Sequence, residues 1–271
     1  MVTSAVLNKL LNQNHADTSK KIERFISNYV SHDSAKGVVI GLSGGLDSSV
    51  ALKLCVNALG PEKVLGLMMP SDTTPKEDVG HAVDLAYGLG LKNYCVIDIL
   101  PLLKSYAVIL PRLAENKKAR GNLMARIRMN LLYYHAGINN YLVVGTSDKS
   151  EMKIGYFTKF GDGGNDLSPI GDLYKTQVIE FAKFLNIPED IINKKSSARL
   201  WENQQTEDEI GLSFKDLDSI LMFINNNDTN KTINLVYNNF PLISKEKISH
   251  ILSLKKKNVH KIKFANICNL N

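Results

Sequence analysis

The sequence predicts an α/β fold, a doubly wound, Rossmann-like parallel sheet flanked by helices. Two observations lead to this prediction. Several short runs of consecutive apolar residues are typical of buried strands, and amphipathic segments with helical spacing separate them along the chain. Continuous apolar strands that alternate with helices indicate a parallel sheet covered on both faces. Right-handed crossovers then place helices on both sides of that sheet.

The predicted elements follow in chain order. Ile22, Phe25, Ile26 and Tyr29 have helical spacing, so a helix is expected within the first thirty residues. Strands are predicted at residues 38–40, 64–69, 94–97 and 141–144, and helices at residues 47–59, 75–89, 122–136 and 175–185.

Two local expectations and one for the whole chain complete the prediction. Thr74 is expected to be the N-cap of the 75–89 helix, with Pro75 at its first position. The Asn-rich stretch 225–240 is expected to be a loop. We expect the whole chain, residues 1–271, to form a single domain with a helical C-terminal part from about residue 212.

Composition indicates an ordinary globular protein. Of its 271 residues, 44% are hydrophobic and 22% are charged, which suffices for a sizeable core. No apolar run approaches the roughly 20 residues that a membrane-spanning helix needs. The first twenty residues are polar, so we expect no signal peptide and a cytoplasmic location. The three cysteines lack C-x-x-C spacing, which argues against a disulfide framework or a zinc site.

The net charge of +6 and the pI near 9.0 leave three interpretations open. Nucleic acid is one, and a phosphate-rich small ligand is another. The third is a solvated basic tail, because many of the surplus cations lie at 255–257 and 261–263. Charge alone does not decide between them.

The first predicted strand leads into a glycine- and serine-rich loop before a helix. This loop is Gly41, Leu42, Ser43, Gly44, Gly45, Leu46, Asp47, Ser48 and Ser49. Glycines let backbone N–H groups approach a ligand, and the N-terminus of the following helix favours an anion. The chain has neither G-x-x-x-x-G-K-[ST] nor G-x-G-x-x-G, so kinase, GTPase and dinucleotide-dehydrogenase interpretations lose their main support.

Asp47 is the unexpected residue of this loop, because a carboxylate repels phosphate. A bound Mg²⁺ that bridges Asp47 and a phosphate would explain it. The alternative is a carboxylate that merely interacts with the helix dipole, worth about 0.3–1 kcal/mol.

Ser-Gly-Gly-Leu-Asp-Ser-Ser resembles the pyrophosphate loop of the ATP pyrophosphatase superfamily, whose sheets are of the adenine nucleotide alpha hydrolase type. Within it, residues 145–151, 155–166, 173–175 and 197–201 together resemble the NAD synthetase family. This resemblance spans about residues 20–220. It implies a ligase that amidates deamido-NAD with ammonia and ATP, through an NAD-adenylate intermediate, to give NAD, AMP and pyrophosphate.

The resemblance also implies roles for individual residues around ATP. Asp47 and Glu151 match the family positions that bind Mg²⁺. Lys175 matches a lysine that contacts ATP phosphate, and together these three form the implied catalytic set. Thr146 and Ser197 match ATP-contacting hydroxyls; the family often has Thr at the second position, so Ser197 keeps the donor.

The second substrate and the assembly follow from the same resemblance. It implies a deamido-NAD site at a homodimer interface, with Tyr156 as a stacking surface for the pyridine ring. The residues it implies for that site are Arg126, Tyr156, Lys159, Asp162, Asp166, His260 and Lys261. One of Arg126 and Arg128 is expected to be a structural ion-pair partner instead.

Glutamine-dependent members carry an additional amidase domain for which 271 residues leave no room. We therefore expect free ammonia, or ammonia from a separate glutaminase, as the nitrogen source. Two alternatives remain. One is a tRNA-modifying ATP pyrophosphatase that adenylates an RNA base, although such enzymes usually need paired cysteines or an RNA-binding module. The other is a non-catalytic nucleotide-binding module, which would not need Asp47, Glu151 and Lys175 together.

Overall fold

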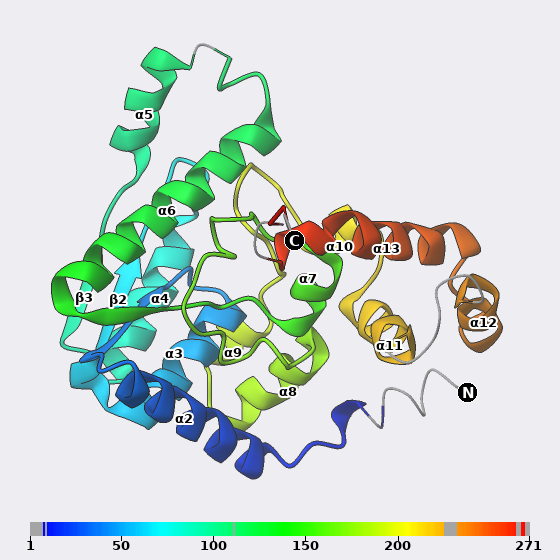
Figure 1. Cartoon of the computed structure of the whole chain (residues 1–271), viewed down its shortest axis with the longest axis horizontal. Coiled ribbons are helices and arrows are strands. Elements are labelled where there is room, and N and C mark those ends of the chain that lie inside the picture. Colours follow the sequence, from blue (N-terminus) through cyan, green and yellow to red (C-terminus); the bar gives the residue numbers. More distant parts are fainter. Residues whose placement is uncertain (1–7, 9, 111, 225–231, 264–266, 269–271) are drawn as a thin grey trace.

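A computed structural model describes residues 8, 10–110, 112–224, 232–263, 267 and 268 of the chain. The described part holds a four-stranded sheet with helices on both of its faces (Figure 1). Its strands are β1 Gly37–Gly41, β2 Val64–Met68, β3 Asn93–Val96 and β4 Tyr141–Val144. All pairings are parallel and the order is β3-β2-β1-β4. The predicted doubly wound α/β sheet is confirmed.

The first half of the chain supplies most helices around this sheet. They are α2 His15–His32, α3 Leu46–Leu59, the short 3₁₀ helix η1 Pro61–Lys63, α4 Lys76–Gly88, α5 Leu100–Ile109 and α6 Lys117–Asn139. The second half supplies α7 Lys149–Ile154, α8 Lys175–Phe184, α9 Glu189–Ile192, α10 Thr206–Ile210, α11 Phe214–Ile224, α12 Thr232–Asn239, α13 Lys245–Asn258 and the 3₁₀ helix η2 Val259–Lys261.

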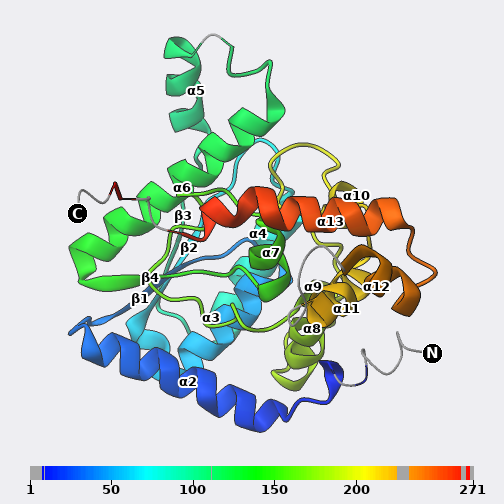
Figure 2. The same cartoon turned by 45° about the vertical axis from the view of Figure 1, so that its right-hand side comes forward.

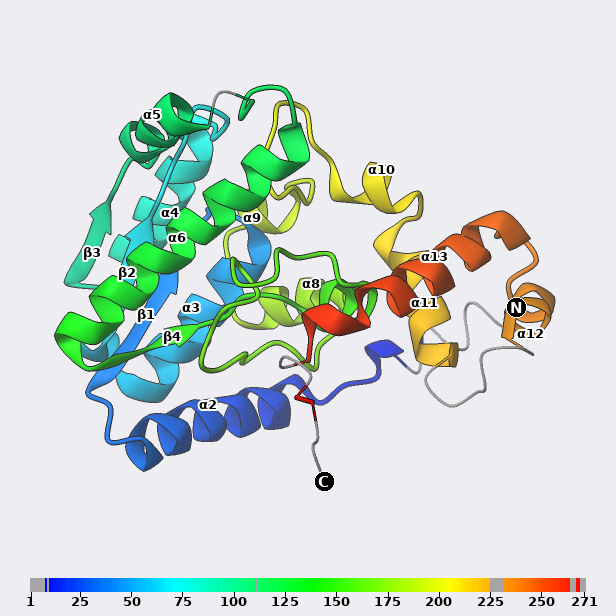
Figure 3. The ribbon, with the colours of Figure 1, turned by 45° about the horizontal axis from the view of Figure 1, so that its top comes forward.

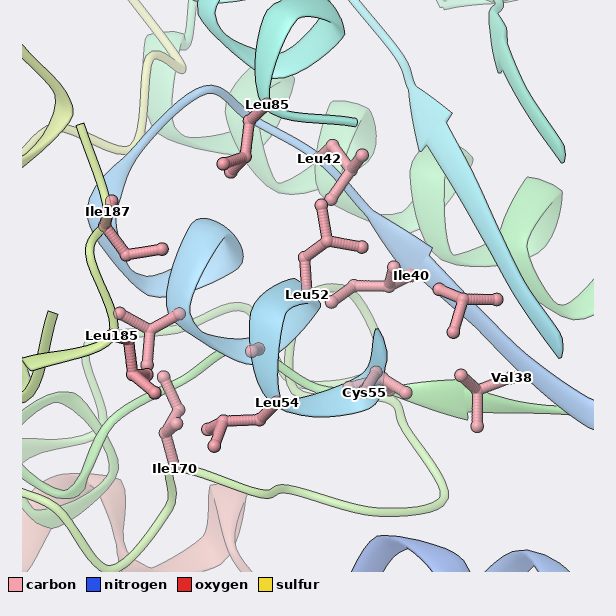
Figure 4. Packing of buried hydrophobic residues seen from close by; sticks show 14 of the residues in the cluster. Val38, Ile40, Leu42, Leu52, Leu54, Cys55, Leu85, Ile170, Leu185 and Ile187 are labelled. Carbon is pink, nitrogen blue, oxygen red and sulfur yellow. The ribbon is translucent and has the colours of Figure 1, made fainter. Parts of the chain in front are cut away.

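Alternation along β1 explains why helices cover both faces. Val38 and Ile40 point into one core with α2, α3, α4 and α8, and Figure 4 shows them beside Leu52 and Cys55 of α3. Val39 points the other way, into a second core with α5 and α6. All three strand residues are fully buried, which matches a strand buried on both faces.

The helices α11, α12 and α13 gather at the opposite end of the molecule from β3 (Figures 1 and 3). A third apolar cluster holds them together, with Leu217, Val236 and Ile248 fully buried, and it includes Ile154 of α7. Figure 2 shows α13 lying across α7, near the carboxyl ends of the strands. These helices make up the C-terminal part of the described chain, and the domain organisation stays a prediction.

Three local expectations need correction. Pro75, not Thr74, is the N-cap of α4, and the Thr74 hydroxyl instead accepts the Ser71 N–H at 3.0 Å. The part of the predicted Asn-rich loop at 232–239 is the helix α12, because Val236 packs into the C-terminal core; residues 225–231 lie outside the described part. Helix α6 begins five residues earlier than predicted, where the Asn116 side chain caps it.

Candidate active site

The loop between β1 and α3 lies at the carboxyl end of the central strand. Gly44 has φ +71°, and a Cβ there would lie 1.9 Å from the Asp78 carbonyl oxygen, so glycine is required at this position. The Ser48 and Ser49 hydroxyls both donate to the Gly45 carbonyl, at 3.1 and 2.8 Å. No side chain caps the N-terminus of α3. The first N–H groups of this helix therefore remain suited to an anion.

Lys175 lies next to this loop, at the first position of α8. Its ammonium is 2.6 Å from Asp47 Oδ2, 3.0 Å from Asp148 Oδ2 and 3.5 Å from Glu151 Oε1. The Lys175 side chain is 2% exposed, and that of Asp148 is completely buried. Three predicted catalytic residues, Asp47, Glu151 and Lys175, are thus brought together from three different helices.

Helix α7 orients two of these carboxylates. Asp148 is its N-cap and Glu151 its third residue, and they form a capping box. Asp148 Oδ1 accepts the Glu151 N–H at 2.8 Å, and Glu151 Oε2 accepts the Asp148 N–H at 3.3 Å. The other oxygen of each carboxylate faces Lys175. A short helix therefore holds the acidic side of the cluster rigidly.

Burial and charge act in opposite directions on the pKa values of this cluster. Burial raises the pKa of Asp148 to about 6, although Lys175 opposes the shift. Burial likewise raises the pKa of Glu151 well above its usual range. Burial alone would lower the pKa of Lys175, but Asp148, Asp47 and Glu151 together raise it. The lysine is therefore charged, and the carboxylates share one cation.

These carboxylates also bear on metal binding. Within the described part of the chain, no group of three or more His, Cys, Asp or Glu side chains could hold a metal ion by itself. Asp47 Oδ1, however, is buried without a hydrogen-bond partner among the described residues. Mg²⁺ is commonly held by one or two carboxylates plus substrate phosphates and water. Asp47 and Glu151 fit that donor set.

A cavity of about 730 Å³ extends from the loop of residues 41–49, called the phosphate loop after its predicted role, to the C-terminal segment, residues 254–261. Most predicted ATP residues line it: Gly41, Leu42, Ser43, Gly45, Leu46, Asp47, Ser48, Thr146, Lys175 and Ser197. Gly44 and Ser49 do not, because Gly44 turns toward α4 and the Ser49 hydroxyl bonds within the loop.

The predicted deamido-NAD residues divide into two groups. Tyr156, Asp162 and Lys261 line the cavity. The Tyr156 hydroxyl donates to Glu209 at 2.7 Å, and the Lys261 ammonium donates to the backbone carbonyls of Gly155 and Phe157 at 2.6 and 2.8 Å. The C-terminal segment thus folds back onto the end of α7.

The second group lies outside the cavity lining: Arg126, Lys159, Asp166 and His260. Arg126 is exposed and donates to the Lys159 carbonyl at 3.2 Å, and the Lys159 ammonium donates to the His260 carbonyl at 2.8 Å. Asp166 accepts from the Tyr133 hydroxyl and from the Val143 N–H.

Arg128 behaves differently from Arg126. It lines the cavity, donates from Nε to the Met69 carbonyl at 2.9 Å, and has its pKa lowered to about 10 by burial, a shift that Asp162 opposes. No salt bridge joins it to a carboxylate within the described residues, so the expectation of a structural ion-pair partner is met by neither arginine there. Both instead hold backbone carbonyls.

Several polar residues of the site were not predicted. They are Asp148, Asp78, Lys194, Arg199 and Asp218. Asp148 had a local signal, because D-x-x-E before an apolar residue indicates a capping box. The other four make contacts across more than 40 residues of sequence, which no local pattern encodes.

The chain is similar to known proteins over most of its length. A family model described as NAD synthase matches residues 18–265. The NH(3)-dependent NAD(+) synthetase of Hyperthermus butylicus is 46% identical over 94% of this chain and 91% of its own.

Solved structures are similar over nearly the whole chain. The NMN synthetase of Francisella tularensis has a TM-score of 0.83 and 32% identity, covering 96% of this chain and 100% of that one. The NH3-dependent NAD synthetase of Campylobacter jejuni has a TM-score of 0.76 and 31% identity, covering 95% and 100%. With its phosphate loop, its buried lysine–carboxylate cluster and these matches, the chain belongs to the NAD synthase family.

Proposed function

We propose that the chain amidates deamido-NAD with ammonia at the expense of ATP and releases NAD, AMP and pyrophosphate. One observation carries this proposal most directly: a buried lysine, surrounded by three carboxylates, next to a loop suited to phosphate. The family and its NH3-dependent relatives support the same activity. Neither the tRNA-modifying alternative nor a non-catalytic role gains support from these relatives.

The first step makes a poor electrophile reactive. An oxygen of the pyridine carboxylate attacks the α-phosphorus of ATP, the bond to the β-phosphate oxygen breaks, and pyrophosphate leaves with the electron pair. Negative charge moves to the departing oxygens as this happens. Lys175 is a compact cation beside the loop and stabilises that charge. The loop N–H groups and the Ser43 and Ser48 hydroxyls position the phosphates.

In the second step ammonia attacks the carbonyl of the adenylate, and AMP leaves with the former carboxylate oxygen. The attacking nitrogen loses one proton, which is transferred to solvent water. A closed site matters here because water would hydrolyse the adenylate. Free ammonia, or a separate glutaminase that supplies it, would be the source.

Mg²⁺ held by Asp47 and Glu151 would neutralise phosphate charge during the first step. The orphaned Asp47 Oδ1 supports this role. Chelation with EDTA should abolish NAD formation, and added Mg²⁺ should restore it. Activity that survives complete chelation would contradict the role.

We also propose a homodimer, and the position of Arg126 outside the cavity lining supports it. Arg126, Asn130, Tyr134 and Ile138 are all exposed and recur every four residues, so they share one face of α6. Tyr134 and Ile138 are 64% and 63% exposed. A second copy that packs on this face would cover the apolar side chains and bring Arg126 into the deamido-NAD site.

A second candidate substrate comes from the resemblance to an NMN synthetase. The corresponding reaction would amidate the pyridine carboxylate of a mononucleotide instead of a dinucleotide. The chemistry at the carboxylate is the same, so only the substrate differs.

One assay separates these possibilities. Purified protein with ATP, Mg²⁺ and ammonium should convert deamido-NAD into NAD, with one AMP and one pyrophosphate per NAD. The same assay with the mononucleotide acid gives the ratio of the two kcat/KM values. A higher value for the mononucleotide would replace the proposed substrate, and no amide from either would contradict the proposed function.

In the described residues no helix has the length and apolarity that a membrane crossing requires. The cytoplasmic location stays a prediction.

A further inference from the structure

Asp78 lies in the first turn of α4, 3% exposed, directly behind the phosphate loop. Its two oxygens bind two different cations from one later segment. Oδ1 is 3.0 Å from the Lys194 ammonium, and Oδ2 is 2.9 Å from Arg199 Nε. A buried carboxylate with two charge-assisted bonds is a strong point of attachment. It ties residues 194–199 to the start of α4.

Lys194 extends this attachment to the phosphate loop itself. Besides Asp78, its ammonium contacts the Gly44 carbonyl oxygen at 2.9 Å and His81 Nδ1 at 2.6 Å. An ammonium has three donors and no acceptor, so these three contacts use all of them, and His81 Nδ1 accepts. Lys194 therefore fixes the Gly44 peptide and has no donor left for a ligand.

Arg199 fixes the other end of the segment. It has φ +52°, a conformation that a residue other than glycine adopts at a cost. Its carbonyl accepts the Thr73 hydroxyl at 2.6 Å, and its N–H donates to Ser197 Oγ at 3.1 Å. The guanidinium bond to Asp78 holds Arg199 there, and Ser197 is held with it.

We infer that Asp78 is a positioning residue. Through Lys194 it holds the phosphate loop in position, and through Arg199 it holds residues 197–199 in position. Asp78 lines the cavity, but it acts through these two residues, because Lys194 and Arg199 bind both of its carboxylate oxygens. The inference rests on the proposed ATP roles of the loop and Ser197. Without the Asp78 charge, Lys194 and Arg199 would lose the carboxylate that they share, and both attachments would weaken.

The test is an Asp78→Asn protein, which keeps the side-chain shape and removes the charge. Asp84→Asn is the matched control, because Asp84 is exposed on the same helix and does not line the cavity. We expect the Kd for MgATP, measured by calorimetry, to rise about 10-fold or more in Asp78→Asn, the effect of losing a charge-assisted hydrogen bond. Asp84→Asn should bind MgATP as the unmodified protein does.

A second readout reports the segment directly. Trp201 is the chain's sole tryptophan and lines the cavity just after Arg199. In ligand-free Asp78→Asn protein, acrylamide should quench Trp201 fluorescence more strongly than in the Asp84→Asn control. A role in stability alone would leave both quenching and MgATP affinity unchanged at a temperature where the variant is folded.

Lys194→Met gives a third measurement, and it decides the matter if Asp78→Asn does not fold. It leaves Arg199 paired with Asp78, so Trp201 quenching should stay near that of the unmodified protein while MgATP affinity falls. Folded Asp78→Asn or Lys194→Met protein with unchanged MgATP affinity would overturn the inference. If the unmodified protein neither binds MgATP nor makes NAD, the proposed function fails instead.

Discussion

Three carboxylates share the Lys175 ammonium in a place that water barely reaches. Lys175→Met would leave Asp47, Asp148 and Glu151 without a cation, and removal of one partner from a buried ion pair typically costs about 3–5 kcal/mol. We expect a loss of that size in the free energy of unfolding, measured with urea, and no detectable NAD formation.

Lys183→Met is the matched control for this variant. Lys183 lies on the same helix and pairs with Glu180 at the surface, where such a pair contributes at most about 1 kcal/mol. Equal losses of unfolding free energy in the two variants would show that the Lys175 cluster contributes no more to stability than a surface ion pair.

Some residues of this site could be predicted from the sequence, and others could not. Asp47 and Lys175 were predicted because they belong to short motifs, and the structure brings them within 2.6 Å. Asp78 and Lys194 contact each other across 116 positions, and neither belongs to such a motif. Residues that orient other residues are recognised from tertiary contacts, which a single sequence does not contain.

At the scale of elements, the turn from β1 into α3 tolerates no side chain at Gly44. Gly44→Ala combines a positive φ with a clash against the Asp78 carbonyl, so the loop has to move. We expect a folded protein, by circular dichroism, that has lost measurable MgATP binding. Gly60→Ala is the control, since Gly60 has φ +81° but nothing within 4 Å of the added Cβ. MgATP affinity should fall in Gly44→Ala and not in Gly60→Ala. Equal affinities in the two variants would show that the conformation of the loop at Gly44 is not needed for MgATP binding.

The C-terminal helices contact the start of α8, next to the site, through Asp218 of α11, which is fully buried. It accepts from the Thr176 N–H at 2.9 Å, at the start of α8, and from the Ser150 hydroxyl, which itself accepts the Lys175 N–H. Asp218→Asn would place an amide donor against these donors. We expect it to lower the free energy of unfolding by about 1–3 kcal/mol and to reduce kcat.

The exposed Asp172, paired with Lys149 of α7, provides the comparison. Asp172→Asn should cost less than about 1 kcal/mol and leave kcat unchanged. If Asp218→Asn is as mild, the C-terminal helices do not support the site in this way.

Elements were predictable where one local pattern sufficed. The four strands are apolar runs, and their predicted ranges agree with the structure to within two residues at each end. Helix α5 was not predicted, because its apolar residues form two short runs, 100–103 and 106–109, on either side of Lys104 and Ser105, although Pro101 lies at its first turn. Helix α12 was predicted as a loop because Asn disfavours helices, whereas burial of Val236 overrides that preference.

At the scale of the whole molecule, the exposed face of α6 should form the interface of the proposed dimer. A Tyr134→Glu, Ile138→Glu double variant would place two carboxylates in that interface. We expect the mass by light scattering to fall from that of two chains to that of one, with NAD formation reduced. Lys183→Glu, an exposed change elsewhere, should leave the mass unchanged. A monomeric unmodified protein with full activity would contradict the dimeric site.

The path of the carboxylate oxygens tests the proposed reaction most directly. Deamido-NAD labelled with ¹⁸O at both oxygens of the pyridine carboxylate is converted with ATP, Mg²⁺ and ammonium, and the products are analysed by mass spectrometry. Attack of the carboxylate on the α-phosphorus predicts one ¹⁸O in each AMP, none in pyrophosphate, and one retained in the amide of NAD. Unlabelled AMP, or label in pyrophosphate, would show that activation does not pass through the adenylate.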